Sequence, residues 1–105
     1  MDMVLAERIL DMVAAVPAGR VSTYGDIAAR AGTPSPRLVG RVLAELSDDD
    51  TPWHRIVRSN GTTAAHSFDE QCQRLRDEGV EVIGGRINLR RFRFRAGLAS
   101  VSDDI

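Results

Sequence analysis

Residues 21–40 have the sequence VSTYGDIAARAGTPSPRLVG, which predicts two short helices joined by a tight turn. Thr23 and Asp26 have the spacing of a capping box, in which Thr23 caps the first helix and Asp26 reaches back to it. This helix is expected to stop at Gly32. Ser35 is a favourable N-cap for the second helix, and the proline after it suits the first helical position. Two short helices joined by a few residues are typical of a helix-turn-helix.

Amphipathic periodicity extends this arrangement on both sides. An N-terminal helix is predicted from apolar residues at i, i+4, i+7 and i+11, with Pro17 and Gly19 ending it: Leu5, Ile9, Met12 and Val16. The helix that begins after Ser35 is expected to bury the first five large apolar residues that follow: Leu38, Val39, Val42, Leu43 and Leu46. It should end in the acidic loop 47–50.

The second half of the chain predicts a small β element and one more helix. Asn60-Gly61 is a strong hairpin signal, so residues 54–58 and 62–65 are expected to pair as a ribbon or wing. A second capping box at 67–70 should start a helix that Gly79 ends, with one face formed by Phe68, Cys72 and Leu75. Residues 80–83 and 87–94 look extended, and 96–105 should form a disordered tail. The expected fold is mainly α, a winged helix-turn-helix-like single domain spanning residues 1–105.

Composition places the chain among soluble globular domains. Of its 105 residues, 43% are hydrophobic and 28% are charged, and no apolar run approaches the roughly 20 residues of a membrane helix. Residues 1–16 are interpreted as structure and not as a targeting peptide. The single cysteine, Cys72, cannot form an internal disulfide and fits a reducing compartment. We expect a monomer of the bacterial cytoplasm, associated with the nucleoid when bound, with no cofactor and no metal.

The charge distribution is more informative than the net charge of −1. All 14 basic residues are arginine, whereas acids cluster in 48–50, in 69–81 and in 103–104. Such clustering can hide a basic surface behind a near-neutral total. The segment 86–95 has five arginines and no acid. It is interpreted as a solvated edge, with an accessory phosphate contact as the alternative.

Two residues of the helix-turn-helix are candidates for DNA contact. Arg37 would occupy the second position of its helix. A cation there interacts unfavourably with the helix dipole and destabilises the helix by about 0.3–1 kcal/mol. A residue that breaks a local rule without visible compensation is a candidate for function. Tyr24, at the start of the first helix, could direct its phenol to a phosphate. The alternatives are a solvated arginine and a tyrosine that packs the helix entrance.

Three segments together resemble one family. Residues 21–28, 36–40 and 52–57, the last with the sequence PWHRIV, resemble the DNA-binding domain of the O6-alkylguanine-DNA alkyltransferases. Those enzymes have Pro-Cys-His-Arg where this chain has Pro-Trp-His-Arg. Tryptophan in place of the acceptor cysteine is the mark of the alkyltransferase-like proteins, and the resemblance covers about residues 3–95. It implies a helix-turn-helix with a β-wing.

The resemblance also implies a chemistry for Trp53. Reversal of alkylation needs a thiolate to attack the alkyl carbon, and an indole cannot do this. We therefore expect no enzyme activity at this position. The indole can instead pack against a base, which is worth about 1–3 kcal/mol. By the same resemblance, Arg37 is the finger that fills the space left by the extruded nucleotide, and Tyr24 presses on the backbone phosphate.

Further residues receive roles from the same resemblance. Contacts with the minor groove or the backbone are expected from Thr23, Tyr24, Leu38, Gly40, Arg41 and Arg55. Arg41 stands where the reversal enzymes have a small residue. The alkylated-base pocket would contain Trp53, Tyr24, His54 and His66. His66 stands where some relatives carry an arginine over the base, with a surface histidine as the alternative, and His54 is interpreted as a structural hydrogen-bonding residue beside the pocket.

Cys72 is interpreted as a core residue because it has helical spacing with Phe68 and Leu75. It also falls near the place of the glutamate that orients the histidine in the reversal enzymes, which suggests that the old proton relay is lost. The function implied is a damage sensor that flips O6-alkylguanine from duplex DNA, transfers no group and signals to nucleotide excision repair through a UvrA-type protein. The alternatives are a residual alkyltransferase using Cys72 and a winged-helix transcription factor.

Overall fold

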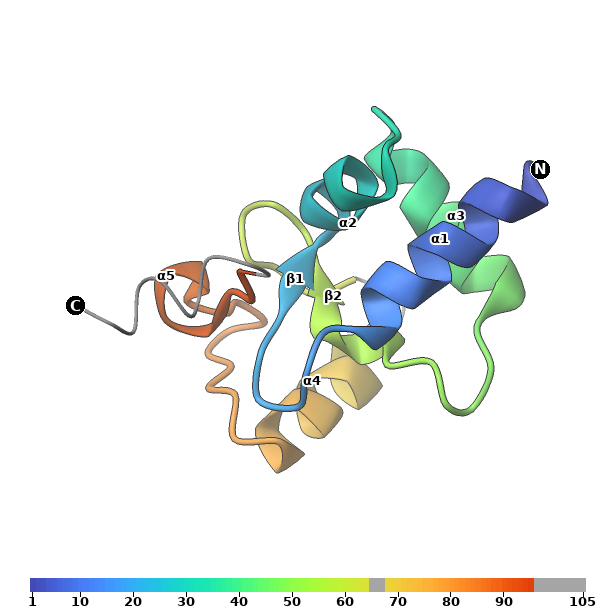
Figure 1. The fold of residues 1–105 in the computed structure, drawn as a ribbon. Helices are drawn as coiled ribbons and strands as arrows, with labels where there is room; N and C mark the ends of the chain where they lie inside the picture. The colour runs from blue at the N-terminus through green and yellow to red at the C-terminus, as the bar shows by residue number, and fades with distance from the viewer. Residues whose placement is uncertain (65–67, 96–105) are drawn as a thin grey trace.

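Three helices form one half of the molecule in a computed structural model, which describes residues 1–64 and 68–95. These helices are α1 (Met3–Ala14), α2 (Tyr24–Ala31) and α3 (Pro36–Leu46), and they pack on one another around a shared core (Figure 1). The fully buried side chains of this core include Ile9, Ile27 and Val39. This half is the predicted helix-turn-helix with its supporting N-terminal helix.

Short-range capping defines α2 and α3. The Thr23 hydroxyl accepts a hydrogen bond from the Asp26 N–H at 3.0 Å, and the Ser35 hydroxyl accepts one from the Leu38 N–H at 3.1 Å. Gly32 ends α2 in the left-handed conformation, with φ of 84°. These predicted boundaries are confirmed. The Asp26 carboxylate itself is bound mainly by Arg93 from the other end of the chain, at 2.8 Å.

The β element differs from the predicted wing. Strand β2 (Ile56–Val57) pairs in parallel with β1 (Ser22–Thr23), directly before α2. Within the described residues, the segments around 54–58 and 62–64 share only one turn-closing hydrogen bond, from the Arg58 N–H to the Thr62 carbonyl at 2.9 Å. The predicted hairpin is therefore wrong in its pairing, although the mainly helical fold with a small sheet is confirmed. Residue 65 lies outside the described residues.

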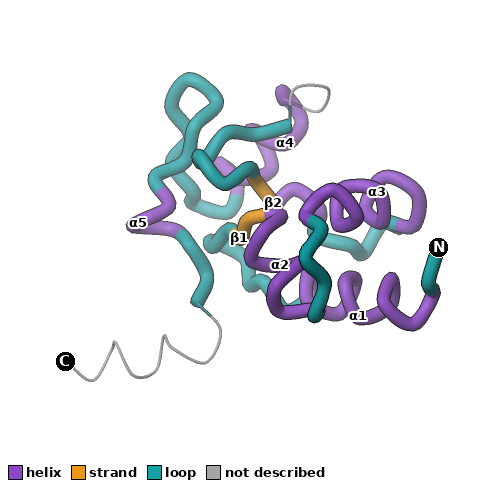
Figure 2. Tube along the Cα trace, turned by 90° about the horizontal axis from the view of Figure 1, so that it is seen from above, coloured by secondary structure: helices purple, strands orange, loops and turns teal. Residues whose placement is uncertain are grey.

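The second half of the molecule surrounds a smaller core. It contains α4 (Phe68–Asp77) and the short α5 (Leu89–Phe92), on the far side of the two strands from α1 and α3 (Figure 2). Cys72 and Leu75 of α4 are buried there, as predicted. The segment 87–94 contains α5 and so is not the extended strand that the sequence suggested. The predicted cap at Ser67 and the tail 96–105 lie outside the described residues.

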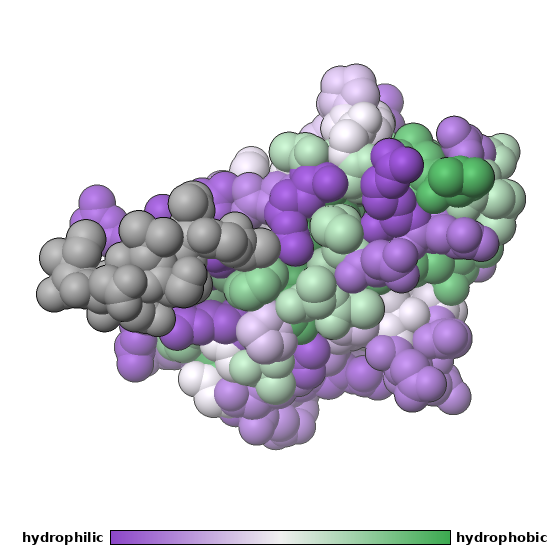
Figure 3. Space-filling view, in the orientation of Figure 1, coloured by the Kyte–Doolittle hydropathy of each residue, from purple (hydrophilic) through white to green (hydrophobic). Residues whose placement is uncertain are grey.

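The C-terminal segment is anchored to the start of the helix-turn-helix. The Val21 N–H donates to the Phe92 carbonyl at 2.9 Å, and the Phe94 N–H donates to the Val21 carbonyl at 2.7 Å. Hydrophilic side chains cover much of the face seen in Figure 3, and apolar surface gathers toward the N-terminal end of α1, where Met3 and Val4 are exposed. None of the helices in residues 1–64 and 68–95 is long and apolar enough to cross a membrane.

Candidate nucleic-acid interface and base pocket

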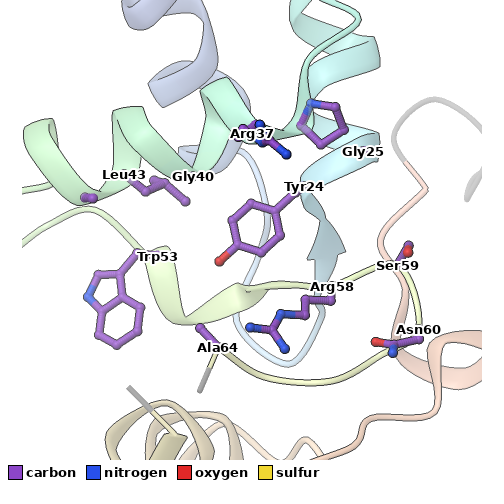
Figure 4. Close-up of a pocket in the computed structure, with 12 residues that line it drawn as sticks. Tyr24, Gly25, Arg37, Gly40, Leu43, Trp53, Arg58, Ser59, Asn60 and Ala64 are labelled. Carbon is purple, nitrogen blue, oxygen red and sulfur yellow. The ribbon is translucent and has the colours of Figure 1, made fainter. Parts of the chain in front are cut away.

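A cavity of about 880 Å³ lies between the helix-turn-helix and the loop that follows β2. Figure 4 shows side chains from both parts facing it. Among residues 1–64 and 68–95, twelve line it: Tyr24, Gly25, Pro36, Arg37, Gly40, Leu43, Ala44, Trp53, Arg58, Ser59, Asn60 and Ala64. Pockets that hold small ligands commonly have volumes of about 300–1,000 Å³, so this one has room for an extruded base and a substituent.

Trp53 forms one wall of the cavity. It begins the 3-10 helix η1 (Trp53–Arg55), and its side chain is half-buried. The guanidinium carbon of Arg74, on α4, lies 5.6 Å from the centre of the indole, within the range of a cation–π contact. Arg74 does not line the cavity. The indole is therefore neither sealed in the core nor free in solvent, and α4 supports it.

A buried glutamine fixes η1 to α4. The Gln71 side-chain amide donates to the carbonyls of His54 at 3.1 Å and Ile56 at 2.8 Å, and its oxygen accepts from the Ala64 N–H at 2.9 Å. All these bonds are made by a side chain that is only 1% exposed. Because buried hydrogen bonds of this kind are costly to break, the backbone on both sides of Trp53 is held in place.

His54 and Arg55 share one carboxylate, that of Glu78. Glu78 accepts from Arg55 at 2.6 Å and lies 2.9 Å from the His54 Nε2. Burial alone would raise the pKa of Glu78, but the hydrogen bonds and charges of Arg55 and His54 outweigh it and lower that pKa to about 2. Arg55 also donates to the Val16 carbonyl at 2.9 Å, which ties η1 to the end of the N-terminal helix region.

This cluster corrects three predictions. Glu78 is the carboxylate partner of His54, so the interpretation that Cys72 stands in place of such a carboxylate was wrong. His54 is buried and does not line the cavity, which removes it from the predicted pocket residues and agrees with its interpretation as a structural hydrogen-bonding residue beside the pocket. Arg55 is fully engaged inside the protein, which leaves it unavailable for the predicted backbone contact with DNA.

Tyr24 and Arg37 come together at the helix-turn-helix side of the cavity. Tyr24 is the first residue of α2 and is half-buried, and burial raises the pKa of its phenol while the charge of Arg58 opposes that rise. The phenol therefore stays protonated at neutral pH and can donate a hydrogen bond. Arg37 is the exposed second residue of α3. Gly40 packs close to the Tyr24 ring, since a Cβ there would lie 3.9 Å from Tyr24 Cε1.

Thr23, Leu38 and Arg41, which were also predicted to contact DNA, do not line the cavity. Thr23 is buried and its hydroxyl is used as the cap of α2, and Leu38 is half-buried against the core. Arg41 is exposed on α3 and pairs with Glu45 at 2.7 Å. His66 lies outside the described residues. The structure thus brings Tyr24, Arg37, Gly40 and Trp53 to one cavity, with Arg41 outside its lining.

Sequence reasoning missed the loop that closes the cavity. Arg58, Ser59 and Asn60 line it opposite α3, whereas the sequence was interpreted as a β-ribbon or wing with no part in the pocket. The available signal was the Asn-Gly turn directly after the Pro-Trp-His-Arg motif, which keeps the following residues near Trp53 whatever their pairing. Cys72, by contrast, is 2% exposed, contacts the Thr63 hydroxyl at 3.9 Å and does not line the cavity.

Comparisons with known proteins identify the family of the chain. Residues 5–80 match the family described as 6-O-methylguanine DNA methyltransferase, DNA binding domain. A DNA base-flipping protein of Escherichia coli (strain K12) is 47% identical over 93 residues, which cover 84% of this chain and 72% of that protein. Alkyltransferase-like protein 1 of Schizosaccharomyces pombe is 43% identical over 81 residues, covering 71% and 75%.

Comparison with solved structures leads to the same family. The crystal structure of S. pombe Atl1 in complex with damaged DNA containing O6-carboxymethylguanine has a TM-score of 0.81 and 33% identity, covering 90% of this chain and 97% of that one. An O6-methylguanine methyltransferase of Mycobacterium tuberculosis, at 23% identity and a TM-score of 0.61, shares the fold. The chain belongs to the family of the 6-O-methylguanine DNA methyltransferase DNA-binding domain. The predicted resemblance to the alkyltransferase-like proteins is confirmed.

Proposed function

We propose that this protein recognises O6-alkylguanine in duplex DNA, extrudes the base into the cavity beside Trp53 and transfers no alkyl group. The observation that carries the proposal is the place of the indole. Trp53 stands where the resemblance puts the acceptor cysteine of the reversal enzymes, and it lines a cavity large enough for a base. One relative is named a DNA base-flipping protein, and a similar solved structure is a complex with damaged DNA. Both support the proposal that this chain binds a flipped, damaged base.

The arrangement of the cavity fits an extruded nucleotide. Arg37 lies on the α3 side, where a long cation could fill the gap left in the base stack, and Tyr24 lies beside it with a protonated phenol. Extrusion costs a few kcal/mol and least for a base with weakened pairing, which gives a preference for lesions. An exposed helix-turn-helix with an arginine at the start of its second helix supplies the contact with the groove.

Absence of alkyl transfer follows from chemistry. An indole has no ionisable thiol, and Cys72, with a side chain only 2% exposed in the second core, has no access to the cavity without local unfolding. His54 and Glu78 remain paired next to a position that has lost its nucleophile. In this protein the pair is a structural support of η1.

A lesion that this protein binds but does not repair has to be removed by another repair pathway. We therefore propose that the complex, formed in the cytoplasm, marks the site for nucleotide excision repair, with a UvrA-type damage sensor as the first partner. Co-sedimentation of the two purified proteins on O6-methylguanine duplex would test this step. Binding of the sensor that is no stronger with the present protein than without it would contradict it.

Equilibrium binding tests the main proposal. Two duplexes of one sequence, with guanine or O6-methylguanine at a single position, are titrated at fixed salt, and a duplex with a radiolabelled methyl group is incubated with the protein in parallel. We expect tighter binding of the lesion, loss of that preference in Trp53→Ala, and no label on the protein. Stable label on the protein would show a transferase, and equal affinities would contradict lesion recognition.

A further inference from the structure

Arg58 places a positive charge on the loop side of the cavity. It directly follows β2, and Figure 4 shows its side chain directed into the cavity beneath the Tyr24 ring, on the opposite side from Arg37. Among the described residues, no carboxylate pairs with it, whereas Arg41, Arg55, Arg74 and Arg93 each have an acidic partner. The donors of the Arg58 guanidinium are therefore available to a ligand.

Arg58 is an exposed residue whose charge is felt at the cavity wall. Among the described residues, it is the charge of Arg58 that opposes the burial-induced rise in the pKa of Tyr24. Tyr24 and Trp53 border the same space. A base that enters this space would therefore meet a wall to which Arg58 also contributes (Figure 4).

The loop that carries Arg58 is held rigidly. The Arg58 N–H donates to the Thr62 carbonyl at 2.9 Å, and the Gly61 N–H donates to the Arg58 carbonyl at 2.8 Å. Gly61 is in turn pressed against the C-terminal segment, where the Ile87 N–H donates to the Gly61 carbonyl at 2.8 Å. Because the backbone of Arg58 is fixed at both of its polar groups, only the side chain has to be ordered when a ligand binds.

We propose that Arg58 is a specificity-determining residue that makes this pocket prefer O6 substituents bearing a carboxylate over neutral substituents of the same shape. The inference rests on the proposed function and adds a class of lesion to it. A guanidinium presents a planar fork of N–H donors that matches the two oxygens of a carboxylate. A phosphodiester offers similar oxygens, but it is present in every duplex and gives no discrimination between lesions.

The test compares three duplexes of one sequence that contain guanine, O6-carbamoylmethylguanine or O6-carboxymethylguanine. The two lesions have nearly the same shape and differ in charge. We expect the protein to bind the carboxymethyl lesion about fivefold more tightly than the carbamoylmethyl lesion, which corresponds to about 1 kcal/mol. In Arg58→Gln this ratio should fall to about one, and Arg58→Lys, which keeps the charge without the fork, should retain about half of the effect.

The matched control is Arg90→Gln, which removes the same charge from the exposed surface of α5 outside the cavity lining. It should leave the carboxymethyl-to-carbamoylmethyl ratio unchanged. An Arg58→Gln variant that is folded by circular dichroism and keeps the ratio would overturn the assignment, as would an equal loss of affinity for all three duplexes, which would assign Arg58 to phosphate. Equal binding of guanine and the carbamoylmethyl lesion by the unmodified protein would instead contradict the proposed function.

Discussion

Replacing Glu78 with glutamine removes the carboxylate that joins α4 to η1. The pKa of Glu78 is lowered from 4.5 to about 2 in the folded protein. One pKa unit is worth about 1.4 kcal/mol, so this difference corresponds to at most about 3 kcal/mol of the free energy of unfolding. The side chain is 17% exposed and the amide keeps one acceptor. We therefore expect Glu78→Gln to lower the free energy of unfolding by about 1–2 kcal/mol at pH 7.

The sign of the pH dependence is fixed by the direction of the pKa change. A carboxylate with a lower pKa in the folded state stabilises it above the unfolded value of 4.5, and this stabilisation is lost as the pH falls toward 2. The unmodified protein and Glu78→Gln should therefore differ most at pH 7 and converge near pH 2. Urea unfolding followed by circular dichroism at pH 7, 4 and 3 measures the difference.

Glu70→Gln is the matched control for this prediction. Glu70 pairs with Arg74 at 2.9 Å, but both side chains are about half exposed, so its removal should cost no more than about 0.5 kcal/mol. Equal urea midpoints of the unmodified protein and Glu78→Gln at pH 7 would refute the reasoning. So would a difference that stays constant from pH 7 to pH 3, because it could not come from ionisation of Glu78.

Two further changes test residues that support the walls of the cavity from outside its lining. Gly61→Ala should lower the free energy of unfolding by at least about 2 kcal/mol, because its φ is 84° and a Cβ would clash with the Ile87 carbonyl oxygen. Gly79→Ala, with φ of 86° and open space, should cost only about 1 kcal/mol, and equal losses would contradict the predicted clash. Arg74→Gln should make the fluorescence of Trp53, the single tryptophan, about twofold more sensitive to acrylamide, since the cation that covers the indole is lost. Unchanged quenching would show that Arg74 does not restrain the ring.

Local signals in the sequence predicted the helical half of the molecule well. Thr23, Gly32 and Ser35 set the ends of α2 and α3 through hydrogen bonds and a backbone conformation that involve only neighbouring residues. Such short-range effects are contained in the sequence of each segment. The candidate site on this half, Tyr24 and Arg37, was accordingly placed in the correct elements.

Strand pairing could not be predicted in the same way. The Asn60-Gly61 turn forms, but Ile56 and Val57 are fully buried and pair with residues before α2 that are distant in sequence. Which strand a short apolar pair joins is decided by burial in the whole fold and not by the nearest turn. Because the strand pairing was predicted wrongly, Arg58 was not recognised as a residue that lines the cavity. The direction of its side chain depends on where this loop packs.

The polar support of η1 was missed for a related reason. Cys72 and Leu75 identify the apolar side of α4, but helical periodicity does not say which polar residues next to that side meet another element. Gln71 lies within α4, and Glu78 directly follows its last residue, seven positions further on. That spacing beside a buried face was the available signal, and the structure shows both side chains on η1.

The central claim, that a damaged base enters the cavity beside Trp53, is tested most directly by the fluorescence of that residue. The chain contains a single tryptophan, so its emission reports this position alone. Matched duplexes with guanine and O6-methylguanine are titrated into the protein at one salt concentration. Quenching by the lesion duplex at saturation, with little change on saturation by the guanine duplex, is the expected result. Saturable lesion binding that leaves the emission of Trp53 unchanged would contradict the account.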